Sequence, residues 1–116
     1  MNWWKRLYLK ITITQAQPLP ELVVCRHPRW SGVRADYLYM FPFCAVCETK
    51  LELEVHHILP VQFFPEYELM WGNLLTLCRP HHFIFGHLLD WKAWNPDVLR
   101  DVQIWNRKIK NRKLTA

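Results

Sequence analysis

A group of cysteines and histidines in this chain has the types and the spacing of metal ligands. Cys44 and Cys47 form a Cys-x-x-Cys pair, and Cys78 follows 31 residues after the pair, close to His81 and His82. A structural zinc ion takes four thiolate or imidazole ligands in a tetrahedron, and a Cys-x-x-Cys turn supplies two of them from one stretch of backbone. The spacing therefore predicts a zinc site built from the three cysteines and one of the two histidines.

Two other uses of the cysteines compete with zinc. One is a set of buried thiols without a metal, since cysteine is among the most buried residue types. The other is a pair of disulfides in an exported domain. Against it, Cys25 stands alone, and the first ten residues contain no uninterrupted apolar run of about 7–15 residues, as a signal peptide would. Zinc in a reducing cytoplasm fits the pattern better.

A second set of polar residues lies between and beside these ligands. His56 and His57 follow an alternating apolar stretch, Asn73 precedes a run of leucines, and His82 stands among the candidate zinc ligands. Imidazole can hold a divalent cation or take a proton near pH 7. Hydrolysis of a phosphodiester needs both functions, because a cation polarises the phosphate while a base activates the attacking water.

Taken in chain order, four segments resemble the HNH endonuclease family, and the resemblance covers about residues 26 to 105. The segments are Cys44-x-x-Cys47, His56-His57-Ile58-x-Pro60, Asn73-Leu74-x-x-Leu77-Cys78 and His81-His82. The flanking residues, including Arg29-Trp30 and Gly86-His87, look like a phage and bacterial subfamily with a Cys-x-x-Cys zinc knuckle. The resemblance implies an α+β fold with a ββα-metal (His-Me finger) core, flanking helices and a structural zinc knuckle.

The resemblance also implies a metal-dependent DNA endonuclease and a role for each residue of the second set. His57 would be the general base that takes a proton from water. His56 and His82 would hold the catalytic divalent ion, which would be Mg²⁺, Mn²⁺, Ni²⁺ or Zn²⁺. Asn73 would hold the loop or the His57 ring in place by hydrogen bonding.

One departure from the family concerns the fourth zinc ligand. In the family this ligand directly precedes the catalytic histidine and is usually Cys, whereas His81 occupies the position here. His81 is therefore expected to complete the zinc site with Cys44, Cys47 and Cys78. The reverse assignment stays open, in which His82 binds zinc and His81 binds the catalytic ion.

Several of these residues also have a purely structural interpretation. Either His56 or His57 could be an ordinary sheet histidine, and Asn73 could be a turn or N-cap residue. His87 could contact the scissile phosphate or cap a helix. Glu68 could orient a histidine, as carboxylates do at metal sites, or lie on the surface.

Charge indicates the partner. The chain has 116 residues, about one domain, and its 15 Lys and Arg exceed its 10 Asp and Glu, which gives a formal charge of +5. A basic surface favours a polyanion, so double-stranded DNA is the expected partner, and the oligomeric state stays open. No apolar run approaches the roughly 18 residues of a membrane span. The candidate DNA contacts are Arg29, Arg34, Arg79 and His87, although a single arginine is more often a solvated surface charge.

The elements that must position these residues follow from local patterns. We expect an N-terminal arm over residues 1–25 with a short strand at 11–14, a nuclease core over 26–95, and a basic helix over 96–116 packed on the core. Within the core and the last helix, the expected elements are a helix over 31–40 with Ser31 as N-cap, a strand over 51–55, a long loop over 58–72, a helix over 80–88, and a helix with Asn95 as N-cap and Pro96 at its first position.

Two rival functions remain beside the nuclease. One is a zinc-stapled DNA-binding or packaging accessory module that keeps the scaffold without cutting. The other is a small zinc-ribbon interaction protein. Neither rival requires His57, Asn73 and His82 together, which favours the nuclease. A cytoplasmic location in a bacterium or a phage-infected host would follow from the resemblance.

Overall fold

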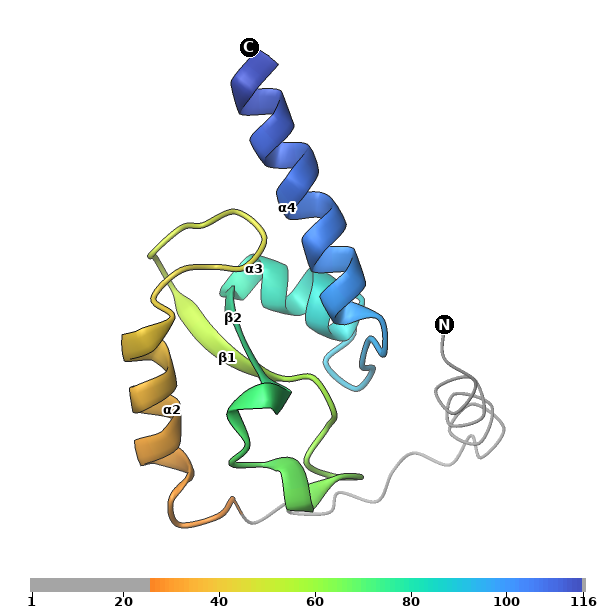
Figure 1. The fold of residues 1–116 in the computed structure, drawn as a ribbon. Coiled ribbons are helices and arrows are strands. Elements are labelled where there is room, and N and C mark those ends of the chain that lie inside the picture. The colour runs from red at the N-terminus through yellow and green to blue at the C-terminus, as the bar shows by residue number, and fades with distance from the viewer. Residues whose placement is uncertain (1–25, 116) are drawn as a thin grey trace, which may run out of the picture.

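The computed structural model of the protein describes residues 26–115 and shows a small mixed α+β fold with one two-stranded sheet, which confirms the α+β class (Figure 1). The arm expected over residues 1–25, with its strand at 11–14, lies outside the described residues. The elements in chain order are α2 (Trp30–Met40), β1 (Leu53–His57), the 3-10 turns η1 (Pro65–Tyr67) and η2 (Trp71–Asn73), β2 (Leu74–Cys78), α3 (Arg79–His81), the π-helical turn η3 (His82–Gly86) and α4 (Val98–Thr115).

β1 and β2 pair antiparallel, with Leu53 opposite Cys78 and His57 opposite Leu74. Successive side chains of a strand point to opposite faces of the sheet, so His56 and His57 leave β1 on different sides. The pairing also places the start of β1 beside Cys78, the last residue of β2 and one of the candidate metal ligands.

Different helices cover the two faces of the sheet, with α2 on one side and α3 and α4 on the other (Figure 1). On the α2 side, Tyr37 packs with Val55 and Leu74, and its hydroxyl donates to the Leu74 carbonyl at 2.9 Å. A second buried cluster joins the residues around the Cys-x-x-Cys turn and the end of β2 to α4. Its members are Cys44, Val46, Leu77, Cys78, Val98 and Val102.

The predicted strand over 51–55 was wrong at both ends, because β1 runs from Leu53 through His57. Leu51 is 75% exposed and Glu52 has a left-handed backbone (φ 53°), so pairing starts only at Leu53. β2 was not predicted as a strand. Four of its five residues are buried, and a strand buried on both faces shows no alternation of apolar and polar residues.

The start of α2 also differs from the prediction, since Arg29 and not Ser31 is the N-cap residue. The Trp30 amide donates to the His27 carbonyl at 2.9 Å, and the Trp30 ring lies 4.4 Å from the ring of His57. The contact with His57 therefore favours a helix that starts at Trp30. Local capping preferences predict a start after Ser31 instead.

The predicted helix over 80–88 is confirmed as a helical segment, in which the short α3 passes directly into the wider turn η3 and ends before Leu88 and Leu89, which adopt a left-handed backbone. The last helix begins at Val98, two residues later than predicted. The Asn95 side chain accepts the Asp97 amide at 2.9 Å and so caps the turn before the helix instead of its first residue. No helix among the described residues is long and apolar enough to cross a bilayer.

Candidate metal centres

The four residues expected to bind zinc come together in the structure. The ligand atoms of Cys44, Cys47, Cys78 and His81 all lie within 4.8 Å of one another. The His81 Nδ1 atom is 3.3 Å from the Cys78 Sγ, and the Sγ atoms of Cys47 and Cys78 are 3.9 Å apart. A tetrahedral ion about 2.3 Å from each sulfur would place the sulfurs about 3.8 Å apart. The four ligands are therefore close enough to bind one metal ion.

The strand pair and the turn together position these ligands. The Ala45 amide donates to the Thr76 carbonyl at 2.9 Å, which ties the Cys-x-x-Cys turn to β2. The Arg79 amide donates to the Glu52 carbonyl at 2.9 Å, which fixes the chain just after Cys78. Three separate segments therefore converge at this point.

The two buried thiols differ in how firmly they hold a proton. Burial raises the pKa of Cys44, but hydrogen bonds from the amides of Cys78, Cys47 and Val46 outweigh it, and the net shift is downward. Burial raises the pKa of Cys78 to about 12, and the neighbouring thiols contribute in the same direction. Metal binding must therefore release the Cys78 proton, which couples occupancy of the site to pH.

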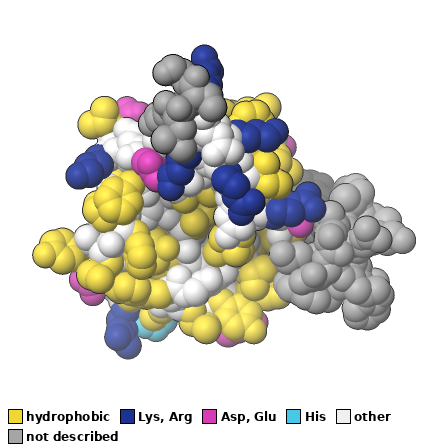
Figure 2. All heavy atoms as spheres, turned by 45° about the horizontal axis from the view of Figure 1, so that its top comes forward, with side chains coloured by type: hydrophobic (Ala, Val, Ile, Leu, Met, Phe, Trp, Pro, Cys, Tyr) yellow, Lys and Arg dark blue, Asp and Glu magenta, His cyan; other side chains and the backbone are white. Residues whose placement is uncertain are grey.

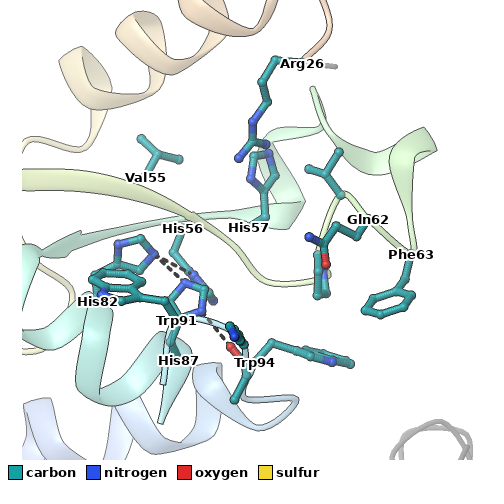
Figure 3. A pocket seen from close by; sticks show the side chains of 14 residues that line it. Arg26, Val55, His56, His57, Gln62, Phe63, His82, His87, Trp91 and Trp94 are labelled. Carbon is teal, nitrogen blue, oxygen red and sulfur yellow. Dashed lines mark hydrogen bonds between the residues drawn. The ribbon is translucent and has the colours of Figure 1, made fainter. Parts of the chain in front are cut away.

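Three histidines form a second cluster whose ligand atoms also lie within 4.8 Å of one another: His56, His82 and His87. The His82 Nε2 atom is 3.1 Å from the His56 Nδ1 and 3.2 Å from the His87 Nε2 (Figure 3). The sequence placed His56 and His82 together and assigned His87 to DNA contact. His87 instead stands beside the other two as a third candidate ligand.

The Nδ1 atoms of His82 and His87, which point away from the cluster, make hydrogen bonds that determine which nitrogen of each ring carries the proton. The Nδ1 of His82 lies 3.2 Å from a carboxylate oxygen of Glu54, and the Nδ1 of His87 lies 2.7 Å from the Ala93 carbonyl. Both oxygens only accept, so both Nδ1 atoms must donate, and in a neutral ring the lone pair is then on the Nε2 atom, which points toward the other ring. Lone pairs 3.2 Å apart repel unless a proton or a cation lies between them.

His56 completes this cluster from the sheet. Its side chain is 3% exposed, and burial, with a smaller effect from the neighbouring histidines, lowers its pKa to about 2. Its Nε2 atom has no hydrogen-bond partner among the described residues. Burial is also the main cause of the lowered pKa of His82. The His56 and His82 rings are thus held neutral, which is the form that binds metal ions.

The π-helical turn explains how His87 joins His82. In an α-helix, residues five positions apart differ by about 140° around the axis, so the sequence predicts no contact between them. In η3 the turn is wider, because π-helices bond residue i to residue i+5, and residues five apart lie on one side. No sequence feature that we recognise predicts this turn.

Gly86 is a further residue that the sequence analysis did not single out as part of the site. A Cβ atom at this position would lie 2.9 Å from the His56 Nδ1 and 3.0 Å from the His82 Cδ2. The close approach of the η3 backbone to the two rings is possible only because this residue has no side chain.

Replacing Gly86 by alanine is expected to push the His56 and His82 rings apart and weaken Ni²⁺ binding at the histidine cluster by about 10–100-fold. Titration calorimetry of the zinc-loaded protein measures the effect. Gly32→Ala is the matched control, because a Cβ there meets nothing within 4 Å. Equal Ni²⁺ affinity in both variants would show that the rings tolerate the extra atom.

His57 lies at the same strand end but has a different environment. Its Nε2 donates to the Glu68 carbonyl at 2.9 Å, so the lone pair of the neutral ring is on Nδ1. Burial lowers the pKa of His57, and the nearby Arg26 guanidinium adds to the effect, so the ring is neutral near pH 7. This is the state that a general base requires.

Asn73 holds the loop that carries the Glu68 carbonyl. Its side-chain oxygen accepts the Leu59 amide at 2.8 Å, and its Nδ2 donates to the carbonyls of Leu59 and Tyr67 at 3.1 and 3.2 Å. Of the two roles expected for Asn73, holding the loop is the one these bonds describe. Glu68 is buried, and its carboxylate accepts the His27 amide rather than a histidine ring.

The histidines open onto a cavity of about 230 Å³ (Figure 3). His56, His57, His82 and His87 line it from one side, and the rings of Phe63, Trp91 and Trp94 contribute apolar walls. Arg26 and Lys92 supply positive charge. A cation site, a neutral imidazole and positive charge thus face one space, which we call the histidine cleft.

The arginines expected to contact DNA are distributed unevenly. Arg29 and Arg34 are exposed on or next to α2 and do not line the histidine cleft. Arg79 donates to Glu54 at 3.2 Å and lies over the Trp91 ring, beside the cluster. Glu54, which the sequence analysis did not select, therefore joins Arg79 to His82. The spacing Glu54-x-His56, with both side chains on one face of a strand, is the signal that could have indicated it.

Replacing Glu54 by alanine is expected to weaken Ni²⁺ binding at the histidine cluster by about 10–100-fold, because the carboxylate fixes the tautomer and orientation of His82. Glu54→Gln keeps an acceptor oxygen and should lose less. Glu66→Ala, which removes an exposed carboxylate from η1, is the control. Calorimetric titration of each zinc-loaded variant decides the matter, and a wild-type affinity for Glu54→Ala would exclude the orienting role.

A scan against family models found no match to this chain, and searches of curated proteins and of solved structures also found none. Its function must therefore be inferred from the chemistry of the two ligand clusters.

Proposed function

We propose that the protein is a metal-dependent endonuclease of the HNH type that hydrolyses DNA phosphodiester bonds. The observation that carries this proposal is the convergence of the His56, His82 and His87 rings on one point, with His57 lining the same cleft. Binding alone does not require a neutral base beside a cation site.

The two clusters have different tasks in this proposal. Cys44, Cys47, Cys78 and His81 bind structural zinc and close the fold, as expected for three thiolates and one imidazole. His56, His82 and His87 bind the catalytic ion. Imidazole ligands suit zinc and nickel better than magnesium, and affinity rises from Mn²⁺ to Ni²⁺. We therefore expect Ni²⁺ or Zn²⁺ to occupy the second site more tightly than Mg²⁺ or Mn²⁺.

In this proposal, the two strands and the helical segment that follows them form a ββα-metal arrangement. β1 contributes the base and one ligand, β2 leads through Cys78 into α3, and the start of the helical segment contributes His82. This order of two strands and a helix is what the resemblance to the HNH family implies.

In the reaction, Nδ1 of His57 takes the proton from the attacking water, while its Nε2 stays bonded to the Glu68 carbonyl and prevents the ring from turning. Asn73 keeps that carbonyl in place through the loop. A divalent cation held by His56, His82 and His87 would polarise the phosphate and neutralise the departing oxygen. Arg26 and Lys92 hold the negatively charged strand in the histidine cleft.

Plasmid cleavage tests the proposal. Zinc-loaded protein should convert supercoiled plasmid to nicked or linear DNA when Ni²⁺, Mn²⁺, Mg²⁺ or Zn²⁺ is added, and should do so far more slowly in buffer without added cation. The control reaction contains neither added cation nor chelator, because EDTA would also remove the structural zinc. DNA binding without cleavage under every cation would favour the accessory module instead.

A further inference from the structure

The formal positive charge of the chain is concentrated in one helix. α4 spans Val98–Thr115 and contains six Lys or Arg residues and a single carboxylate, Asp101. The rest of the chain contains nine Lys or Arg residues and nine Asp or Glu residues. The net charge of +5 is therefore the charge of α4. The six cationic residues are Arg100, Arg107, Lys108, Lys110, Arg112 and Lys113.

One face of α4 packs on the core, and its described cationic side chains lie on the exposed faces. Val98, Val102 and Ile109 face the buried cluster around the Cys-x-x-Cys turn, and the Asn106 amide donates to the Val46 carbonyl at 3.0 Å. Arg107 and Lys108 are exposed on the remaining surface. Figure 2 shows Lys and Arg side chains gathered at the end of the molecule from which α4 projects in Figure 1.

Arg100 pairs with Asp101 of the same helix at 3.9 Å, whereas the contacts of Lys108 and Lys110 neutralise little of their charge. Lys110 pairs with Glu48 at 3.1 Å, but both side chains are about half exposed. Lys108 lies 5.2 Å above the Trp105 ring, which orients the ammonium group without neutralising it. A surface of this kind attracts a polyanion.

The position of α4 connects this surface to the histidine cleft. Asn95, just before α4, donates from its backbone amide to the Gly86 carbonyl at 3.0 Å and from its side chain to the Phe85 carbonyl at 2.9 Å. The helix thus begins beside η3 and runs away from it. Between Arg100 and Arg112 it advances about 18 Å. Over about 18 Å of the duplex axis, one DNA strand carries about five phosphates.

We propose that α4 is a docking surface for the phosphate backbone of duplex DNA outside the histidine cleft. The inference rests on the proposed function for the identity of the polyanion, since it takes the substrate of the cleft to extend along the helix. Only DNA long enough to pass beyond the cleft would then bind tightly.

The test variant is Arg107→Gln/Lys108→Gln/Lys110→Gln, which removes three exposed charges and none of the buried stripe. Anisotropy titrations with a labelled duplex of about 30 base pairs, in the His57→Ala background without added divalent cation, measure affinity against salt. The triple variant should bind at least about tenfold more weakly, and the slope of log K against log salt should fall by about 2.7, or 0.9 per lost contact. A duplex of about 8 base pairs should show a much smaller loss.

Lys50→Gln is the control, because Lys50 is an exposed lysine over the Phe43 ring, as Lys108 is over Trp105, but lies outside α4. It should keep the wild-type slope. Zinc content and thermal midpoint should be unchanged in all variants.

The failures of the two proposals are distinguishable. An unchanged salt slope in the triple variant would overturn docking on α4, even if the wild-type protein cuts plasmid. Loss of binding to phosphatidylserine vesicles with DNA affinity retained would overturn it in favour of a lipid surface. Loss of DNA affinity in the triple variant, in a protein that never cuts, would support docking on α4 and refute the nuclease.

Discussion

Replacement of His57 by alanine is expected to reduce plasmid cleavage by about 10²–10⁴-fold, the usual contribution of a general base. The reduction should appear in kcat, because the histidine cluster proposed to bind the cation does not include His57. Zinc content and Ni²⁺ affinity should stay close to those of the wild-type protein. Single-turnover cleavage with saturating Ni²⁺ measures the effect.

His27→Ala is the matched control for this experiment. His27 is an exposed histidine near the start of α2, and its backbone amide, which donates to the Glu68 carboxylate, is kept in the alanine variant. It should cut at close to the wild-type rate. Wild-type cleavage by His57→Ala would instead remove His57 from the reaction, and equal losses in both variants would indicate a structural effect on the loop at Glu68.

Replacement of Cys78 by serine is expected to destabilise the whole fold. Cys78 joins the four-ligand cluster to β2 and is a member of the buried cluster that contacts α4. Structural zinc contributes on the order of 10 kcal/mol in small zinc domains, which is comparable with the whole stability of a domain of this size. The variant should lose stoichiometric zinc, its cooperative thermal transition and Ni²⁺ binding at the histidine cluster.

Loss of the four-ligand cluster should also disturb the histidine cluster, because the adjacent residues His81 and His82 belong to one cluster each. Circular dichroism melts and metal analysis give the readout, with Cys25→Ser as the control because the sequence leaves Cys25 outside the four-ligand set. A zinc-free Cys78→Ser protein with a wild-type melting curve would show that packing alone maintains the fold.

The sequence was sufficient to predict the composition of the four-ligand cluster, because Cys-x-x-Cys spacing and the positions of Cys78 and His81 depend on local backbone geometry. It was also sufficient to bring His56 and His82 together. It did not place His87 with them, since α-helical periodicity puts residues five apart on different sides and nothing local predicts the π-helical turn. Gly86 was not selected for the same reason.

The errors in the secondary structure have a related origin. Ser31 has the chemistry of an N-cap, but the contact between Trp30 and His57 comes from a distant segment and moves the start of α2. Leu51 fits an alternating pattern and is nevertheless exposed, because strand pairing begins opposite Cys78. Tertiary contacts of this kind override local preference at the ends of elements.

The adjacency of His56 and His57 on β1 has a consequence for how such a protein can diversify. In the proposed reaction, one peptide unit in a paired strand separates the residue that accepts the proton from a residue that binds the cation, and a paired strand is among the least deformable parts of a backbone. Side chains that line the cleft outside the histidine cluster, such as Gln62 and Lys92, can change without altering that separation. Recognition of new targets can therefore evolve independently of bond cleavage.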